Sequence, residues 1–358
     1  MLNINSLHRG VLAHLAIRAT SLAVILLLGF AATARAQTPP PVPPGISPTG
    51  SVDGLAAKFI DVKGVKTRYY EYGQGEPMVL VHGEGWSGHS SANTWSKNIP
   101  GLAKRFHVFA ADKLGSGLTG NPLDDKDLNI QGEVEHMYQF ILAMKVGPVH
   151  LVGQSRGGGC VFFLAYLHPE IVRTLVIVDT GTAAPVVGET NRQTVLTACP
   201  KEPDWAEWSC RLKQISFLPE VAFDDTFFQT GRYMASFPKS AETVAKRKAG
   251  AGEPLESQFN DWKKSVHARV EKEPVLMMPI LLYWGKDDPS AMLKNGLALL
   301  DVISVQNPNV RMIIANNSGH FHYREHPEEW NRNVINFIDY WEKQPPATPK
   351  KPSAAIQK

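Results

Sequence analysis

The chain has 358 residues, 43% of them hydrophobic, and a formal net charge of +3. This size and composition fit one large globular domain or a domain with an insertion. Arg9, Arg18 and Arg35 all lie in the first 36 residues, which hold no acid, so +3 − 3 leaves about zero for the remainder. A near-neutral body argues against nucleic acid or an anionic membrane surface as a partner.

The N-terminal segment has the order of features expected of a secretory signal. Basic residues come first, an apolar run follows over residues 22–32, and Ala34 and Ala36 stand where a peptidase needs small side chains. We predict that residues 1–36 are a signal peptide cleaved after Ala36. The mature protein would then be exported, periplasmic or secreted, without stable membrane association. A single N-terminal anchor is the alternative, although the run is short for a membrane span.

Three cysteines are present, and two of them are close in sequence. Cys199 and Cys210 lie in one segment, whereas Cys160 stands alone. Export to an oxidising compartment makes a Cys199–Cys210 disulfide plausible. Two free buried thiols remain the alternative.

Between its two ends the chain alternates apolar strands with amphipathic helices. Residues 37–55 are predicted to be a proline-rich linker and residues 344–358 a disordered tail of similar composition. Short apolar runs separated by helices favour a mostly parallel, eight-stranded sheet flanked by helices. The expected strands cover residues 58–62 and 65–73, as an opening antiparallel pair, and then 77–83, 105–112, 149–155, 174–180, 279–285 and 310–319.

One region interrupts this alternation. Residues 181–270 show no convincing buried strand but several helical patterns rich in aromatic side chains. We interpret them as a helical cap inserted between two parts of an α/β core, residues 56–180 and 271–343. Such a cap would lie over the carboxyl edge of the sheet, where open α/β folds bind their ligands.

The strand over residues 149–155 ends in a serine between glycines. In VHLVGQSRGGGC, Gly153 and Gly157 stand two residues before and after Ser155. A turn tight enough to present the hydroxyl above the sheet leaves no space for side chains at those two positions. The pattern alone is weak, because glycine and serine are common. It becomes strong when an acid and a histidine follow in that order.

Both partners follow at the expected places. Asp287 and Asp288 come just after a core strand, and His320 precedes the final helix. A serine hydroxyl needs a base within hydrogen-bond reach, and the imidazole needs an acid to fix its tautomer. We assign Ser155 as nucleophile, His320 as base and Asp288 as the orienting acid.

With this order of residues the folded part resembles the α/β-hydrolase superfamily. Members usually carry the acid three residues after a strand-end glycine, which fits Gly285 and Asp288, with Asp287 as runner-up. Asp179 is a third candidate, because some members place the acid there, although it would also serve to cap a strand end. By the same resemblance, VHGEGWSG supplies an oxyanion loop, and the backbone N–H groups of Glu84 and Arg156 form the oxyanion hole. The Glu84 carboxylate should then point away.

Three segments further resemble the meta-cleavage-product hydrolases, which cut a carbon–carbon bond in vinylogous diketo acids. They are HGEGWSGHSSANTW, FFQTGRY and GHFHYREHPEEWNRNVINFI. The resemblance implies that Asn93, Arg232 and Phe321 contact substrate, with Arg232 binding a carboxylate or keto-enolate. Arg232 could instead be a surface residue of the cap, and Asn93 a turn or helix-capping residue. The chain has Gln154, Arg156 and Phe321 where those enzymes usually have asparagine, methionine and tryptophan.

Three functions follow from these patterns. The first is a serine hydrolase that acts on an ester or lactone of a small apolar or aromatic acid. The second is a carbon–carbon hydrolase of the meta-cleavage type, and the third is a non-catalytic binding protein of the same fold. An Arg232 side chain directed into the cleft would favour the second, and one directed to solvent the first. We expect no cofactor and no metal, since His320, His322 and His326 have no second ligand cluster.

Overall fold

The computed structural model describes residues 39–187 and 199–344. The predicted leader, the first two residues of the predicted linker, part of the predicted cap and almost all of the predicted tail lie outside these ranges. Within them, no helix combines the length and apolar character needed to span a membrane.

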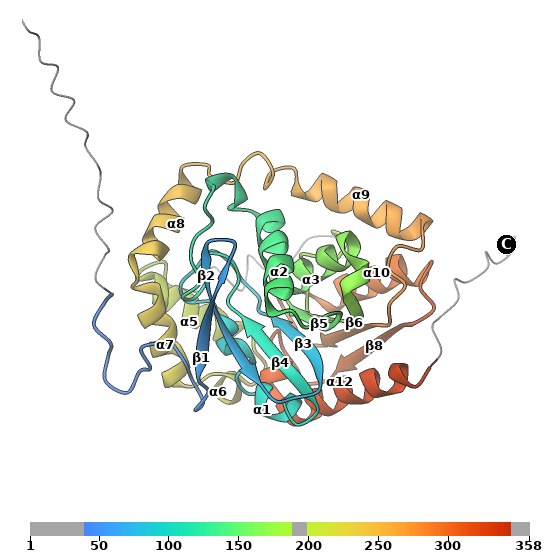
Figure 1. The fold of residues 1–358 in the computed structure, drawn as a ribbon, viewed down its shortest axis with the longest axis horizontal. Coiled ribbons are helices and arrows are strands. Elements are labelled where there is room, and N and C mark those ends of the chain that lie inside the picture. The colour runs from blue at the N-terminus through green and yellow to red at the C-terminus, as the bar shows by residue number, and fades with distance from the viewer. Residues whose placement is uncertain (1–38, 188–198, 345–358) are drawn as a thin grey trace, which may run out of the picture. The chain divides into compact units, whose positions relative to one another are not determined.

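A single eight-stranded sheet forms the centre of the molecule, in the order β1-β2-β4-β3-β5-β6-β7-β8 (Figure 1). Strand β2 pairs antiparallel with β1 and with β4, and all the other neighbours are parallel. The prediction of a mostly parallel sheet with an opening antiparallel pair is therefore confirmed. The strands are β1 Ala57–Val62, β2 Val65–Tyr72, β3 Glu76–Val81, β4 Phe106–Ala111, β5 Val149–Gln154, β6 Val172–Val178, β7 Ile280–Gly285 and β8 Val310–Ala315.

Helices cover both faces of this sheet. Side chains alternate along each strand, so Val79 and Val81 of β3 face one helical layer while Met78 and Leu80 face the other. The first layer contains α2, α3 and α10, and the second contains α1 and α12. These helices are α1 Ile99–Leu102, α2 Ile130–Met144, α3 Arg156–Leu167, α10 Leu293–Ser304, α11 His322–Glu325 and α12 Pro327–Glu342, with 3-10 turns at Ala92–Trp95, Asp125–Asp127 and Pro169–Ile171.

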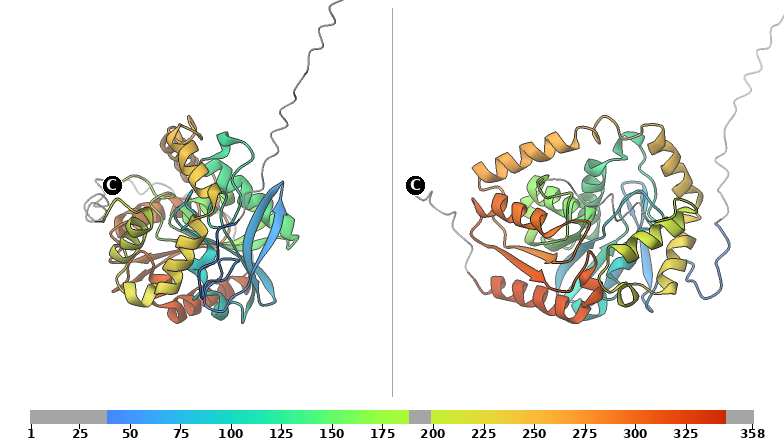
Figure 2. Two further views of the ribbon diagram at one scale, coloured as in Figure 1. Left: turned by 90° about the vertical axis from the view of Figure 1, so that its left-hand side faces the viewer. Right: turned by 180° about the vertical axis from the view of Figure 1, so that it is seen from behind.

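A helical region, here called the cap, lies between β6 and β7. Its described residues form helices and no strand, and Figure 2 shows them as the yellow-green to orange segments beside the sheet. The Cys199–Cys210 disulfide is present at the start of this region, and Cys160 is a buried free thiol. The cap helices are α5 Asp204–Gln214, α6 Pro219–Ala222, α7 Asp225–Ala235, α8 Pro238–Lys248 and α9 Phe259–Lys272.

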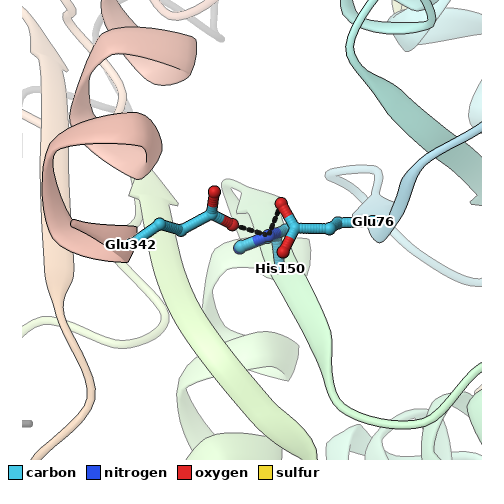
Figure 3. A group of neighbouring side chains, drawn as sticks. All are labelled: Glu76, His150 and Glu342. Atoms are coloured by element: carbon cyan, nitrogen blue, oxygen red, sulfur yellow. Dashed lines mark ion pairs between the residues drawn. The ribbon is translucent and has the colours of Figure 1, made fainter.

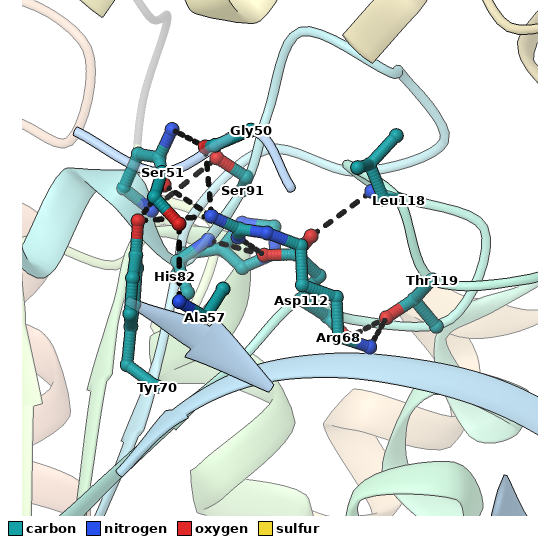
Figure 4. Close-up of polar contacts among 12 residues, drawn as sticks. Gly50, Ser51, Ala57, Arg68, Tyr70, His82, Ser91, Asp112, Leu118 and Thr119 are labelled. Atoms are coloured by element: carbon teal, nitrogen blue, oxygen red, sulfur yellow. Dashed lines mark hydrogen bonds and ion pairs between the residues drawn. The ribbon is translucent and has the colours of Figure 1, made fainter. Parts of the chain in front are cut away.

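The described part of the proline-rich segment, residues 39–55, is packed against the folded body and does not act as a free linker. Arg68 of β2 donates hydrogen bonds to the carbonyl oxygens of Thr49, at 2.6 Å, and Gly50, at 2.8 Å. Figure 4 shows Arg68 beside Gly50. Ile46 packs against Tyr233 and Met234 of the cap. The interpretation as a linker was therefore wrong for this stretch, because an extended segment can satisfy its carbonyl groups with a buried guanidinium.

Candidate active site

Ser155 lies on the sharp turn that joins β5 to α3. Its backbone has φ 54° and ψ −124°, a conformation that costs a non-glycine residue on the order of 1–3 kcal/mol. A side chain at Gly153 would overlap the carbonyl group of Gly157, and one at Gly157 would overlap the carbonyl oxygens of Val81 and His82. Close packing of the turn therefore requires both glycines.

Asp288 and His320 are hydrogen-bonded to each other, although 32 residues separate them in sequence. The Nδ1 atom of His320 lies 2.7 Å from Asp288 Oδ2, and both residues are almost fully buried. The other carboxylate oxygen, Oδ1, accepts hydrogen bonds from the backbone N–H groups of Ser290, at 2.7 Å, and Ala291, at 3.0 Å. The carboxylate is therefore held in one orientation, with Oδ2 directed at the imidazole.

The two other candidate acids are placed differently. Asp287 is exposed, and its Oδ2 accepts a 3.3 Å hydrogen bond from the Ser318 backbone. Asp179 is fully buried at the end of β6, where its Oδ1 accepts a 2.8 Å hydrogen bond from Gly285 N and its Oδ2 lies 2.9 Å from His322 Nε2. Burial, with a contribution from Asp288, raises the pKa of Asp179 well above its usual value. Asp179 is therefore held at the end of β6 by Gly285 and His322.

The backbone of His320 is fixed from both the core and the cap. Its N–H donates to the carbonyl oxygen of Ile215, the residue that follows α5, at 2.8 Å. Its carbonyl oxygen accepts a 3.1 Å hydrogen bond from Gln154 Nε2. Gln154, the residue before Ser155, thus holds the backbone of His320 in place, a contact that the sequence pattern did not reveal. The cap contributes directly to the position of the imidazole.

The residues assigned to the oxyanion hole lie close to Ser155. Glu84 and Arg156 both border the same cavity as Ser155. Glu84 has φ 48°, which turns the loop after β3 sharply, and Arg156 is the first residue of α3. The N–H groups of a first helical turn have no acceptor within the helix and favour a negative charge. The use of these two amides for an oxyanion stays a prediction.

The carboxylate of Glu84 is engaged by the cap and by its own loop. It accepts hydrogen bonds from Ser90 Oγ at 2.6 Å, Trp208 Nε1 at 3.0 Å and Arg211 Nη2 at 3.1 Å. Trp208 and Arg211 belong to α5. These donors compensate the negative charge, and they connect the loop beside the nucleophile to the cap.

Arg156 takes part in a largely buried charge network. Its Nε donates to Glu133 Oε2 at 2.8 Å and its Nη1 to Glu256 Oε1 at 3.5 Å. Lys113 Nζ lies 3.4 Å from Glu133 Oε1, and neither of these two side chains is exposed. Burial opposes the charge of Arg156, but Glu133 and Glu256 outweigh it and raise its pKa. The guanidinium is thus occupied by protein carboxylates.

A cavity of about 800 Å³ connects these groups to the cap. Ser155, His320 and Phe321 line it from the core, together with the loop that contains Glu84. The walls on the cap side come from α5, the end of α8 and the start of α9. The cap residues that line it in these helices are Asp204, Glu207, Trp208, Arg211, Leu212, Val244, Arg247, Lys248, Phe259, Asn260 and Lys263. A cavity of this size accommodates a small-molecule substrate.

Of the three residues predicted to contact substrate, the structure brings one to the cavity. Phe321 lines it next to His320. Asn93 does not: its Oδ1 accepts hydrogen bonds from Tyr70 Oη, at 2.6 Å, and from Arg68, at 2.9 Å. The structure does not bring Asn93 to the cavity, because its side chain is hydrogen-bonded to the buried guanidinium of Arg68, and its contact with substrate stays a prediction. The same network, with Asp112, is drawn in Figure 4.

Arg232 is likewise outside the cavity lining. It is exposed on α7, and its guanidinium lies 4.9 Å from the ring centroid of Trp205 on α5. The side of α7 that is buried carries Phe227, Gly231 and Met234. Arg232 therefore stacks on a cap tryptophan, and the structure does not support the prediction that it binds a substrate carboxylate.

The three histidines near the C-terminal end have separate partners. His320 faces Asp288, His322 faces Asp179, and His326 Nε2 lies 3.3 Å from the carbonyl oxygen of Asn317. Burial lowers the pKa of His322 to about 4. The three histidines therefore do not form one common set of metal ligands.

One other group has the composition of a metal site among the described residues. Glu76, His150 and Glu342 meet where β3 and β5 begin and α12 ends (Figure 3). Arg105 lies 2.8 Å from Glu76 and 2.7 Å from Glu342, and Arg173 also contacts Glu76. Two guanidinium groups already compensate these carboxylates. The cluster is therefore better described as an ion-pair network than as a cation site.

The comparisons with known proteins agree with this geometry. The family described as "alpha/beta hydrolase fold" matches residues 76–327. The 2-hydroxy-6-oxo-6-(2'-aminophenyl)hexa-2,4-dienoic acid hydrolase of Metapseudomonas resinovorans is 28% identical over 289 residues, which cover 80% of this chain and 92% of that protein. The 2-hydroxymuconate semialdehyde hydrolase of Pseudomonas sp. strain CF600 is 28% identical over 278 residues, 77% of this chain and 91% of that protein.

A solved structure shows the same similarity. A serine hydrolase involved in carbazole degradation matches with a TM-score of 0.60 and 25% identity, over 80% of this chain and 99% of its own. The family match and these relatives define a hydrolase with an α/β core. The chain belongs to the α/β-hydrolase fold family. The hypothesis of a non-catalytic binding protein is therefore set aside.

Proposed function

We propose that this enzyme is a serine hydrolase that cleaves an ester or lactone of a small apolar or aromatic acid. The observation that carries the proposal is the 2.7 Å contact between Asp288 and His320, at a cavity that also contains the strained turn of Ser155. A hydroxyl, an imidazole and an oriented carboxylate are the groups that acyl transfer requires. The exposed position of Arg232 favours an ester over a diketo acid.

In the proposed reaction, the Ser155 hydroxyl attacks the substrate carbonyl carbon, and His320 Nε2 takes the hydroxyl proton. The Asp288 carboxylate accepts a hydrogen bond from Nδ1–H of His320 and stabilises the imidazolium. The amides of Glu84 and Arg156 stabilise the oxyanion, each by about 2.7–4 kcal/mol. His320 then protonates the leaving oxygen, which leaves an acyl group on Ser155. A water molecule, deprotonated by His320, attacks this acyl group, and the acid departs with Ser155 restored.

A panel of p-nitrophenyl esters with short, branched and aromatic acyl groups tests this proposal. The purified protein should release p-nitrophenolate from at least one ester, and the Ser155→Ala protein should release it at the uncatalysed rate. Equal rates for the two proteins would contradict the assignment of Ser155. No release from any ester would contradict ester hydrolysis.

Carbon–carbon hydrolysis of the meta-cleavage type is the second candidate. The two relatives described above favour it, since their names place them among hydrolases of ring-cleavage products. The loss of visible absorbance of a ring-cleavage dienoate, measured beside the ester panel, separates the two functions. Faster turnover of the dienoate than of every ester would replace the first proposal by the second.

We also propose that the enzyme works outside the cytoplasm. The sequence of residues 1–36 supports this, and so does the Cys199–Cys210 disulfide, because such bonds persist in oxidising compartments. Fractionation of the producing cells, followed by N-terminal sequencing, should find a mature chain that begins at Gln37. A chain that retains residues 1–36 in the cytoplasm would contradict export.

A further inference from the structure

A buried lysine lines the cavity on the cap side. Lys263 lies in α9 and is only 4% exposed, yet it borders the same cavity as Ser155 and His320. Its Nζ lies 5.4 Å from the ring centroid of Phe259, one helical turn earlier, which also lines the cavity. A charged group in this position is costly unless it has a partner.

The other buried or half-buried cations of the cavity wall have protein partners. Arg156 is paired with Glu133, and Arg211 is paired with Glu84. Arg247 lies 3.7 Å from Glu256 and donates to the carbonyl oxygen of Leu128. Their charges are therefore compensated before any substrate enters.

Lys263 differs from these residues. Among the residues that the structure describes, no carboxylate forms an ion pair with it and no acceptor forms a hydrogen bond with it. Burial lowers its pKa, and no neighbouring negative charge offsets that effect. Within residues 39–187 and 199–344, Lys263 is thus a cation at the wall of the cavity without a compensating carboxylate. An anionic ligand in the cavity would supply the partner that the described residues do not provide.

We propose that Lys263 binds an anionic group of the substrate, a carboxylate, at the end remote from the scissile bond. This inference rests on the proposed function, because it assumes that the cavity receives the substrate of Ser155. It makes the enzyme a hydrolase of substrates that carry a free carboxylate in addition to the bond that is cleaved. Phe259, which lines the same cavity, provides an apolar surface for the carbon chain or ring of the same substrate.

The neighbouring lysine provides a matched control. Lys264 is the next residue of α9, its side chain is 73% exposed, and it is paired with Asp261 at 3.2 Å. Lys263→Met and Lys264→Met each remove one positive charge from the same helix turn. Only the first removes it from the cavity, so a difference between the two variants reports on the cavity and not on net charge.

The test compares two esters of equal acyl length, the p-nitrophenyl monoester of glutaric acid and p-nitrophenyl valerate. The quantity measured is the ratio of their kcat/KM values, anionic over neutral. A charged hydrogen bond predicts that Lys263→Met lowers this ratio about 10- to 100-fold, mainly through KM. Lys264→Met should keep the ratio, and Lys263→Arg should restore part of it. An unchanged ratio in Lys263→Met would overturn the proposal.

Two further readouts separate the possible failures. If Lys263 only packs on Phe259, then Lys263→Met should lower the melting temperature and slow both esters equally, and the proposal is wrong. If the wild-type enzyme hydrolyses neither ester, the proposed function of ester hydrolysis is contradicted. The role of Lys263 is then tested separately, by calorimetric titration of the Ser155→Ala protein. Monomethyl glutarate should bind more tightly than methyl valerate, and Lys263→Met should abolish the difference. Equal binding of both probes to the Ser155→Ala protein that retains Lys263 would overturn the proposal.

Discussion

Replacement of Asp288 by asparagine tests how the carboxylate acts on His320. In the structure, Oδ1 of Asp288 accepts two backbone hydrogen bonds, from Ser290 and Ala291, and Oδ2 faces Nδ1 of the imidazole at 2.7 Å. An asparagine oxygen would keep the two backbone bonds. Its NH₂ group would then face Nδ1.

This exchange reverses the tautomer of the imidazole. An NH₂ donor requires Nδ1 to be the acceptor, so the proton moves to Nε2, the atom that must take the proton of Ser155. The imidazolium also loses its counter-charge. A loss in kcat of about 10⁴-fold is expected for this combination, which corresponds to about 5.5 kcal/mol in the barrier.

Asp287→Asn is the matched control, because Asp287 is the neighbouring aspartate and, unlike Asp288, is exposed. Its 3.3 Å contact with the Ser318 backbone survives in asparagine, so kcat should change less than about twofold. Steady-state kinetics on the best ester of the panel, with circular dichroism to confirm folding, measures both variants. Equal losses in the two variants, or a loss in Asp288→Asn of less than about tenfold, would refute the reasoning.

Two predictions concern stability. Arg68→Met should lower the free energy of unfolding, measured in urea titrations, by about 3–5 kcal/mol, since it leaves the Asp112 carboxylate buried without its 2.8 Å partner. Lys58→Met is the control. It breaks an exposed ion pair with Glu71 and should lower the free energy of unfolding by less than about 1 kcal/mol. Burial lowers the pKa of His136 from 6.5 to about 4. Between these pH values the folded protein therefore binds fewer protons than the unfolded chain. The contribution of His136 to the free energy of unfolding is complete above pH 6.5 and falls as the pH is lowered toward 4. His136→Gln, which can keep the bond to Thr67, should remove up to about 3 kcal/mol of the loss between pH 7 and pH 4. Identical pH profiles of the variant and the wild type would contradict this.

The parts of the site that the sequence predicted are those fixed by local geometry. The turn at Ser155 needs glycines on both sides, and these are visible as a pattern. The sheet strands are short apolar runs between turns, and the acid follows its strand by a fixed spacing. Such features depend on residues that are close in sequence, which is why they were predictable.

The predictions that the structure does not support depend on contacts between distant segments. Asn93 stood in a segment that resembled a substrate-binding loop, but the sequence could not show that Arg68 would lie buried beside it. The proline-rich composition of residues 39–55 indicated an extended chain. It could not show that Arg68 would donate hydrogen bonds to the carbonyl groups of this chain. Arg232 follows Gly231, which lies on the buried side of α7, and a step of one residue rotates a side chain by about 100°.

A signal for Lys263 was nevertheless present in the sequence. Phe259, Lys263, Val266 and Val270 recur at three and four residues, so the lysine falls on the apolar side of its helix. A cation in such a pattern is either satisfied within the protein or reserved for a ligand. The structure was needed to show that no carboxylate of the described residues meets it.

The most direct test of the central claim is the site of covalent labelling by a fluorophosphonate. This reagent reacts with a serine that an imidazole activates, and intact-protein mass spectrometry followed by peptide mapping identifies the residue. We predict one label per chain, located on Ser155, absent in Ser155→Ala and strongly slowed in His320→Ala. Labelling of another residue, or no labelling of a folded wild-type protein, would contradict the claim that Ser155 is the activated nucleophile.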